Sequence, residues 1–363
     1  MKAAVIEAVG APFEVQDVTI AGPQGHEVLV EVKASGLCQS DLHVASTNVG
    51  FPLPAVLGHE VAGVVTAVGP DVTGFRVGEH VVTSPVHSCG RCRGCLTGKP
   101  YQCRVPQHTQ RPREAQPRLS RGTDPLTQFI GVGGFAEQVL VHENTVVSVP
   151  HDLPFDRAAL LGCGVVTGAG AALNTARVRP GDTVAVIGCG GVGLNVIQGA
   201  ALAGAQRIIA VDLQSAKLDL AREFGATDTV NAAEVDSVQA VLDTTRGGVT
   251  HAFEVIGLKA TAENAIAMLD VGGTAYLIGV HQPGATLNVT PFGDLMGRQK
   301  GIRGVAMGSA NIKVDIPMFA DLYLQGRFKL DELISQRISL AEIDHGYELL
   351  RGGAVARSVI TSF

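Results

Sequence analysis

TVAVIGCGGVG, residues 183–193, is the stretch of this sequence that most clearly indicates a fold. It opens with an apolar run, which is typical of a strand buried on both faces of a parallel sheet. The rest fits the pattern G-x-G-x-x-G, with glycines at 188, 190 and 193, and a helical segment begins at about Gly191. Glycines at these positions let the turn close and let the backbone approach a pyrophosphate, which then lies against the free N–H groups of the helix. The stretch therefore predicts a dinucleotide site.

The residues that follow alternate between strand and helix patterns. A second apolar strand is expected at 207–212, a helix at 216–224, and strands at 252–256 and 274–280 on either side of a helix at 260–269. This order predicts a doubly wound parallel sheet of the Rossmann type. Asp212 ends the second strand, at the separation expected of a carboxylate that binds the adenosine ribose. Because a carboxylate repels a 2′-phosphate, Asp212 favours NAD(H) over NADP(H).

The first 160 residues have a different pattern. Period-two alternation at 27–33 and short apolar runs at 60–69 and 79–83, separated by turn residues, predict a small β-barrel or sandwich. Residues 104–128 carry four prolines and five arginines with almost no apolar periodicity. We expect a long solvated loop there, or a lid that contacts an anion.

The composition limits the classes of protein that fit. The chain has 363 residues, 46% hydrophobic and 17% charged, so two domains with sizeable cores are expected. A net charge of −6 and the absence of Trp argue against nucleic acid as a partner. We expect no membrane association, because the start does not resemble a signal peptide and no run of about 18 apolar residues is evident. A cytoplasmic protein is therefore expected, in which metal ligation explains the presence of seven cysteines better than disulfides do, with Cys189 a small filler of the glycine turn.

Four of the cysteines lie within fifteen positions, at Cys89, Cys92, Cys95 and Cys103. Four thiolates so close together fit one tetrahedral Zn²⁺. Four protein ligands leave no open position, so this zinc is predicted to be structural; redox-active dithiols are the alternative.

A second group of candidate residues opens with Cys38-Gln39-Ser40-Asp41-Leu42-His43, which follows a glycine-marked turn. Taken alone, this hexapeptide could be a polar loop with a buried cysteine or part of a metal site. His59 and Cys163 stand elsewhere in the chain as further metal-binding types. If Cys38, His59 and Cys163 converge, they leave a fourth position open, as in a catalytic zinc site.

These motifs together resemble the zinc-containing alcohol dehydrogenases of the medium-chain dehydrogenase/reductase superfamily. The resemblance extends over nearly the whole chain, from Gly36-Leu37-Cys38 to Arg357. It implies an α/β protein with a GroES-like, β-rich catalytic domain at 1–163 and 307–363, and a Rossmann NAD-binding domain at 164–306. It also implies two Zn²⁺ ions per chain, a homodimer or homotetramer, and a small-molecule alcohol or carbonyl substrate.

The resemblance assigns a role to each matching residue. Cys38, His59 and Cys163 match the catalytic zinc ligands, Asp41 the carboxylate that orients the ligand histidine, and Glu60 the acidic residue behind the zinc. Ser40 matches the hydroxyl that bonds the substrate oxygen, and His43 the end of a proton relay that runs through the nicotinamide ribose to water. The cofactor-binding positions are matched by Thr167, Gly188, Gly190, Gly191, Val192, Gly193, Asp212, Lys217, Val280 and Arg357. Among them, Thr167 and Val192 lie near the nicotinamide, Asp212 and Lys217 contact ribose, and Arg357 contacts a phosphate.

The implied reaction is reversible hydride transfer between an alcohol and NAD. Val49, Phe129, Ile130 and Val280 match pocket positions and are apolar, which favours uncharged aliphatic or aromatic alcohols. Two residues depart from the family pattern: Gln39 replaces a basic residue at the pyrophosphate, which could weaken cofactor binding, and Pro85 replaces an aromatic pocket wall. The alternatives are a thiol-adduct, formaldehyde-type dehydrogenase whose arginines at 104–121 contact the thiol cofactor, a nicotinoprotein that retains NAD, and a non-enzymatic zinc-stabilised scaffold.

Overall fold

The structure is a computed structural model, and it describes residues 1–112, 114–352 and 357–363. Arg113, one of the five arginines of the 104–128 segment, lies outside these residues. The chain forms two compact units, one of Met1–Cys163 with Asn311–Phe363 and one of Gly164–Ala310. The short turn η8 (Met307–Ser309) belongs to the second unit, because Gly308 packs directly on Gly170 and Ser309 bonds to Thr175.

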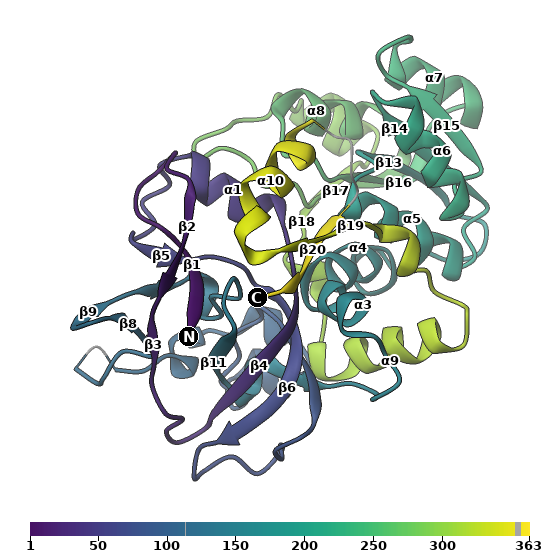
Figure 1. Ribbon diagram of the computed structural model, residues 1–363. Helices are drawn as coiled ribbons and strands as arrows, with labels where there is room; N and C mark the ends of the chain where they lie inside the picture. Colours follow the sequence, from purple (N-terminus) through teal and green to yellow (C-terminus); the bar gives the residue numbers. More distant parts are fainter. Residues whose placement is uncertain (113, 353–356) are drawn as a thin grey trace. The chain divides into compact units, whose positions relative to one another are not determined.

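The main sheet of the first unit is built around one long strand, β4 (Glu27–Gly36). In the described part of the chain its strands follow the order β12-β7-β6-β4-β20-β19, and β11 also pairs with β4. The C-terminal strands thus lie beside strands from the start of the chain (Figure 1). The bounds are β6 (Glu60–Val68), β7 (His80–Thr83), β11 (Gln138–His142), β12 (Val146–Ser148), β19 (Ile334–Ser339) and β20 (Arg357–Ser362). Inward-facing valines of β4, whose alternation the sequence shows, form its core together with valines of β6, β7, β11 and β12.

Two smaller sheets and five helices complete the first unit as described. One sheet has the order β10-β5-β1-β2 and the other β3-β8-β9. Their strands are β1 (Lys2–Ile6), β2 (Phe13–Asp17), β3 (Thr19–Ile20), β5 (Ala55–Val56), β8 (Leu119–Arg121), β9 (Asp124–Pro125) and β10 (Thr127–Gln128). The helices are α1 (Gln39–Ser46), α2 (Arg93–Leu96), α3 (Phe155–Leu160), α9 (Ile312–Leu324) and α10 (Ile343–Arg351).

The described residues of the Arg- and Pro-rich segment are largely exposed, as expected of a solvated loop, but short strands and ion pairs hold them to the rest of the first unit. Its arginines make internal ion pairs: Arg111 and Arg118 with buried Glu27, and Arg121 with Glu7. The sequence gives no sign of these pairs, because the partners lie 84 to 114 residues apart. The segment also supplies β8 to β10, so short strands hold it in addition to the ion pairs.

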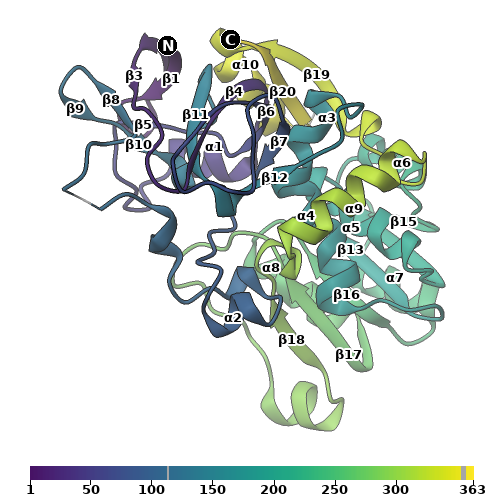
Figure 2. The ribbon, with the colours of Figure 1, turned by 90° about the horizontal axis from the view of Figure 1, so that it is seen from below.

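The second unit is a six-stranded parallel sheet in the order β15-β14-β13-β16-β17-β18. Counted from β13, this is the order 3-2-1-4-5-6 of the doubly wound dinucleotide-binding fold. Figure 2 shows β13, β16, β17 and β18 side by side. The strands are β13 (Thr183–Ile187), β14 (Arg207–Asp212), β15 (Asp228–Asn231), β16 (Val249–Glu254), β17 (Leu269–Leu277) and β18 (Gly301–Gly304). The crossover helices are α5 (Gly191–Leu202), α6 (Ser215–Glu223), α7 (Ser237–Thr245) and α8 (Lys259–Ala267).

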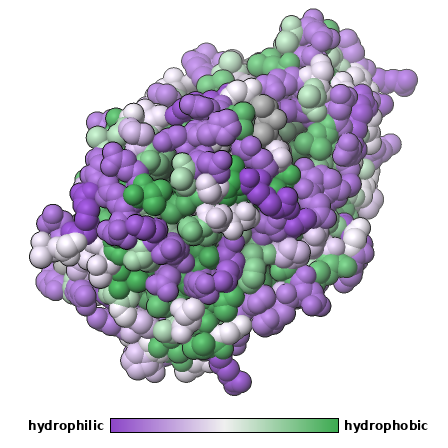
Figure 3. Space-filling model, in the orientation of Figure 1, coloured by the Kyte–Doolittle hydropathy of each residue, from purple (hydrophilic) through white to green (hydrophobic). Residues whose placement is uncertain are grey.

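One helical segment, Phe155–Ala176, is long and apolar enough to cross a membrane by length and composition alone. It comprises α3, α4 (Val166–Gly170) and π-helical turns, and 89% of its most apolar window is buried inside the protein. Such burial is a feature of core helices. The face of the molecule in Figure 3 carries hydrophilic residues interspersed with hydrophobic ones.

Candidate metal and nucleotide sites

The hexapeptide at 38–43 begins helix α1 rather than forming a loop. Cys38 is the residue that precedes the first helical turn, and its backbone N–H donates to Asp41 Oδ2 at 3.3 Å. A carboxylate at this position satisfies a free N–H group and suits the positive end of the helix dipole. Ser40 and His43 lie one turn apart on the helix and are partly exposed, and Ser40 Oγ is 3.1 Å from the Cys38 sulfur.

His59 is oriented by Asp41. The buried Asp41 carboxylate receives the Gly58 N–H at 2.8 Å and lies 3.1 Å from His59 Nδ1, both through Oδ1. Although burial alone would lower it, the charge of Asp41 raises the pKa of His59 well above its usual value. Because Asp41 occupies Nδ1, the second ring nitrogen, Nε2, is left to face the sulfurs of Cys38 and Cys163.

Cys163 completes the cluster from a π-helical turn, Leu161–Val165, at the end of the first unit. Its sulfur is 3.3 Å from His59 Nε2, and one ligand atom each from Cys38, His59, Glu60 and Cys163 lies within 4.8 Å of the others. The neighbouring Cys163 thiol and the positive charge of His59 lower the pKa of Cys38, whereas the Cys38 sulfur and burial raise that of Cys163. The expected convergence of Cys38, His59 and Cys163 is thus present in the structure.

Glu60 and Arg357 lie behind this cluster. Burial raises the pKa of Glu60 to about 7, and both its carboxylate oxygens lack a hydrogen-bond partner among the described residues. Arg357, at the start of β20, lies 3.5 Å from Glu60 and donates to the Leu37 carbonyl at 3.2 Å. The guanidinium therefore contacts its own unit, and the predicted phosphate contact of Arg357 stays a prediction.

The donor set fits a zinc ion. Two sulfurs and an imidazole nitrogen at about 2.3 and 2.1 Å from one tetrahedral ion would be about 3.5 Å apart, close to the 3.3 Å between His59 Nε2 and the Cys163 sulfur. A cation here would also compensate the buried Glu60 carboxylate, whose oxygens accept no hydrogen bond among the described residues. Three ligands with one further position is the arrangement of catalytic rather than structural zinc.

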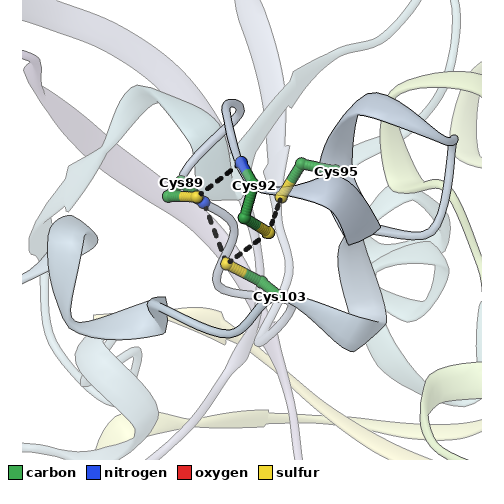
Figure 4. A group of neighbouring side chains, drawn as sticks. All are labelled: Cys89, Cys92, Cys95 and Cys103. Carbon is green, nitrogen blue, oxygen red and sulfur yellow. Dashed lines mark hydrogen bonds between the residues drawn. The ribbon is translucent and has the colours of Figure 1, made fainter.

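The four-cysteine lobe forms a second metal-binding group (Figure 4). The Cys92 sulfur is 3.5 Å from that of Cys95 and 3.9 Å from that of Cys103, against about 3.8 Å expected for sulfurs around one tetrahedral zinc. Backbone N–H groups of Cys95 and Arg104 lower the pKa of Cys92 to about 6, whereas burial raises that of Cys95 to about 12. A cation is therefore needed for all four sulfurs to be thiolates together.

The glycine turn of the second unit has the geometry of a phosphate cradle. Gly188 has φ +101°, and a Cβ on Gly193 would stand 1.8 Å from the Gly188 carbonyl oxygen, so neither position accepts a side chain. Around Gly190, which precedes α5, a Cβ would meet nothing within 4 Å. Asp212 accepts the Cys189 N–H at 2.8 Å, which fixes its carboxylate beside the turn. The residues fit a dinucleotide at the start of α5.

The remaining predicted cofactor residues lie at several places in the second unit. Thr167 is buried in α4 with its hydroxyl 3.7 Å from the Met307 sulfur. Lys217 is half-buried on α6, and Val280, which follows β17, is 63% exposed.

An aromatic group borders the metal cluster within the first unit. The buried Phe129 ring meets the His59 ring edge to face at 5.6 Å, and Phe51 meets Phe129 in the same manner at 5.3 Å. Ile130 follows with a positive φ of 45°, and Val49 is exposed. Phe51 was not predicted from the sequence, since it follows no motif.

Comparison with known proteins agrees with this geometry. Residues 24–151 match the family model of the alcohol dehydrogenase GroES-like domain, and 191–322 that of zinc-binding dehydrogenases. The chain is 37% identical to an alcohol dehydrogenase class-3 of Cereibacter sphaeroides and 36% to an S-(hydroxymethyl)glutathione dehydrogenase of Paracoccus denitrificans, each over 99% of both chains.

Among solved structures, benzyl alcohol dehydrogenase of Acinetobacter calcoaceticus superposes with a TM-score of 0.94 at 37% identity. The match covers 100% of this chain and 99% of that one. Family models, full-length relatives and fold thus agree, and the chain belongs to the zinc-containing alcohol dehydrogenases of the medium-chain dehydrogenase/reductase superfamily, a family of oxidoreductases.

Proposed function

We propose that this protein oxidises uncharged, apolar alcohols with NAD, reversibly, to aldehydes or ketones. The observation that carries the proposal is the buried set of Cys38, His59 and Cys163, oriented by Asp41 and bordered by the ring of Phe129. Apolar walls next to a single cationic centre suit a substrate whose only polar group is the reacting hydroxyl.

The metal-site residues of the first unit and their neighbours on α1 each have a role in the proposed reaction. Cys38, His59 and Cys163 hold the catalytic zinc, with Asp41 fixing the tautomer of His59. Zinc supplies Lewis acidity, which favours loss of the hydroxyl proton of an alcohol. Ser40, beside Cys38, accepts this proton, and the partly exposed His43 one turn later passes it toward water.

The second unit binds and orients the dinucleotide. The free N–H groups at the start of α5 bind the pyrophosphate, and Asp212 and Lys217 contact the ribose hydroxyls. The carboxylate of Asp212 selects NAD(H) over NADP(H). NAD supplies the hydride acceptor.

The arginines of the Arg- and Pro-rich segment help to distinguish apolar alcohols from a thiol adduct as the substrate. A thiol-adduct dehydrogenase, as named for the Paracoccus relative, would need cationic groups free to contact a charged thiol cofactor. Arg111, Arg118 and Arg121 instead make ion pairs within the protein, which leaves Arg104 exposed among the described arginines of the segment. We therefore favour apolar alcohols and retain the thiol adduct as the second candidate.

Three further properties belong to the proposal. The four-cysteine lobe holds a structural zinc, which gives two zinc ions per chain. The enzyme works in the cytoplasm, and it assembles as a homodimer or homotetramer like other members of the family.

The test is NAD-linked turnover on ethanol, hexanol, benzyl alcohol and formaldehyde, the last with and without glutathione, with zinc counted per chain. We expect turnover to be fastest on benzyl alcohol or hexanol, to depend on zinc, and to be slower with NADP. Formaldehyde oxidation that requires glutathione and exceeds alcohol oxidation would favour the thiol adduct. Zinc in the four-cysteine lobe alone, without turnover, would refute an enzymatic role.

A further inference from the structure

We propose that His87 is a positioning residue that sets substrate specificity: it connects the Arg- and Pro-rich segment to the backbone of Ile130 and so holds Phe129 against His59. The inference rests on the proposed function, because it gives Phe129 a place in the substrate site. His87 was not singled out by any sequence motif.

The first step is the contact of His87 with a strained turn. Ile130 has φ 45° and ψ 40°, a left-handed conformation that is unfavourable for a β-branched residue. His87 Nε2 lies 2.8 Å from the Ile130 carbonyl oxygen. A Cβ on the next residue, Gly131, would stand 2.8 Å from His87 Cε1, so the imidazole packs directly on this turn. Because a carbonyl only accepts, Nε2 must carry a hydrogen in this bond.

The second step is the other side of the ring. His87 Nδ1 lies 2.5 Å from the hydroxyl of Thr109, which is almost fully buried. Arg118 donates to the Thr109 carbonyl at 2.6 Å and to Glu27 at 2.8 Å. A continuous series of hydrogen bonds therefore runs from Glu27 on β4 through Arg118, Thr109 and His87 to Ile130.

The third step leads to the site. Phe129 precedes Ile130, and its ring is the one that borders His59 at 5.6 Å and is supported by Phe51. A left-handed residue persists only where its surroundings hold it. Removing the bond to the Ile130 carbonyl lets this turn relax and moves the ring of Phe129. The wall beside the metal cluster should then discriminate less between bulky and small alcohols.

The experiment compares His87→Leu with His87→Gln, whose side-chain amide can still donate to the Ile130 carbonyl. Measured as the ratio of kcat/KM for benzyl alcohol to that for ethanol, specificity should fall about tenfold in His87→Leu. It should stay close to the original value in His87→Gln. Arg121→Gln is the matched control, since it removes an arginine of the same segment that pairs with Glu7 and not with Thr109. Zinc per chain should be unchanged in all three.

The position of the Phe129 ring in crystals is a second measurement, which does not depend on turnover. In crystals of His87→Leu, the ring of Phe129 should lie farther from His59, and φ of Ile130 should become negative. If His87→Leu does not fold, Thr109→Val interrupts the same series of bonds and should reproduce both effects more weakly. An unchanged specificity ratio, or an unmoved Phe129 ring, would overturn the inference. A lack of alcohol turnover in the unaltered protein would instead refute the proposed function, and the crystals would still decide the role of His87.

Discussion

Replacement of Asp41 by Asn tests the organisation of the metal site most directly. Asp41 Oδ1 accepts hydrogen bonds from the Gly58 N–H and from His59 Nδ1, and Oδ2 accepts one from the Cys38 N–H. Asn keeps an oxygen for the first two contacts. Its amide nitrogen then faces the Cys38 N–H, so two donors oppose each other at a fully buried position.

The contacts of Asp41 predict two separate losses, one in the free energy of unfolding and one in zinc affinity. An unpaired buried donor lowers the free energy of unfolding by about 1–3 kcal/mol. Loss of the carboxylate on a ligand histidine lowers metal affinity by about 10- to 100-fold, which corresponds to about 1.4–2.7 kcal/mol. The first loss should persist without metal, and the second should appear only in zinc binding.

The assay follows zinc release under graded chelator competition and urea unfolding of both metal-free proteins. Asp17→Asn is the control, because Asp17 is exposed and its ion pair, with Lys2, lies at the protein surface. If Asp41→Asn released catalytic zinc at the same chelator concentration as the unaltered protein, the assigned role of Asp41 would be wrong.

Three other changes test the remaining sites. Cys92→Ser should lower zinc from about two ions to about one per chain, measured by mass spectrometry of the native protein; retention of both would contradict a lobe zinc. Asp212→Ser should reduce the preference for NAD(H) over NADP(H), measured as the ratio of kcat/KM, and an unchanged ratio would exclude Asp212 as the selecting group. Glu27 has a lowered pKa because, although burial opposes it, hydrogen bonds from Arg111 and Arg118 favour its charged form. Its contribution to stability is present above the unfolded pKa of about 4.3 and is lost as the pH falls through the lower folded pKa. The stability difference between the unaltered protein and Glu27→Gln in urea should therefore shrink from pH 6 to pH 3, and a constant difference would contradict the assignment.

The sequence was sufficient where a local pattern determines the structure. The apolar runs and glycine turn at 183–193 predict β13 and the start of α5 because strand, turn and helix are each encoded by neighbouring residues. The four-cysteine lobe is predicted for the same reason. The alternation at 27–33 predicts a strand, and β4 continues to Gly36.

The sequence was insufficient where distant charges determine the structure. The 104–128 segment has no apolar periodicity, its arginines pair with Glu27 and Glu7, and no local pattern links these partners. For residues 38–43 the sequence left a polar loop and a metal site open, because polar side chains do not indicate a helix start whose Asp41 is buried against His59. The role of His87 likewise depends on Thr109 and Ile130, which meet it only in the folded chain.

The pairing of β20 with β4 has a consequence for biosynthesis. Cys38, His59 and Cys163 are translated well before residue 357, yet the guanidinium that balances buried Glu60 lies on β20. A nascent chain that still lacks this strand would expose an uncompensated acidic group behind the ligands and leave an edge of the sheet open. Zinc that binds to the nascent chain would then do so at a ligand site that is more negatively charged and less well packed than the site in the folded protein. Correct metal loading is therefore expected to follow the synthesis and pairing of β20.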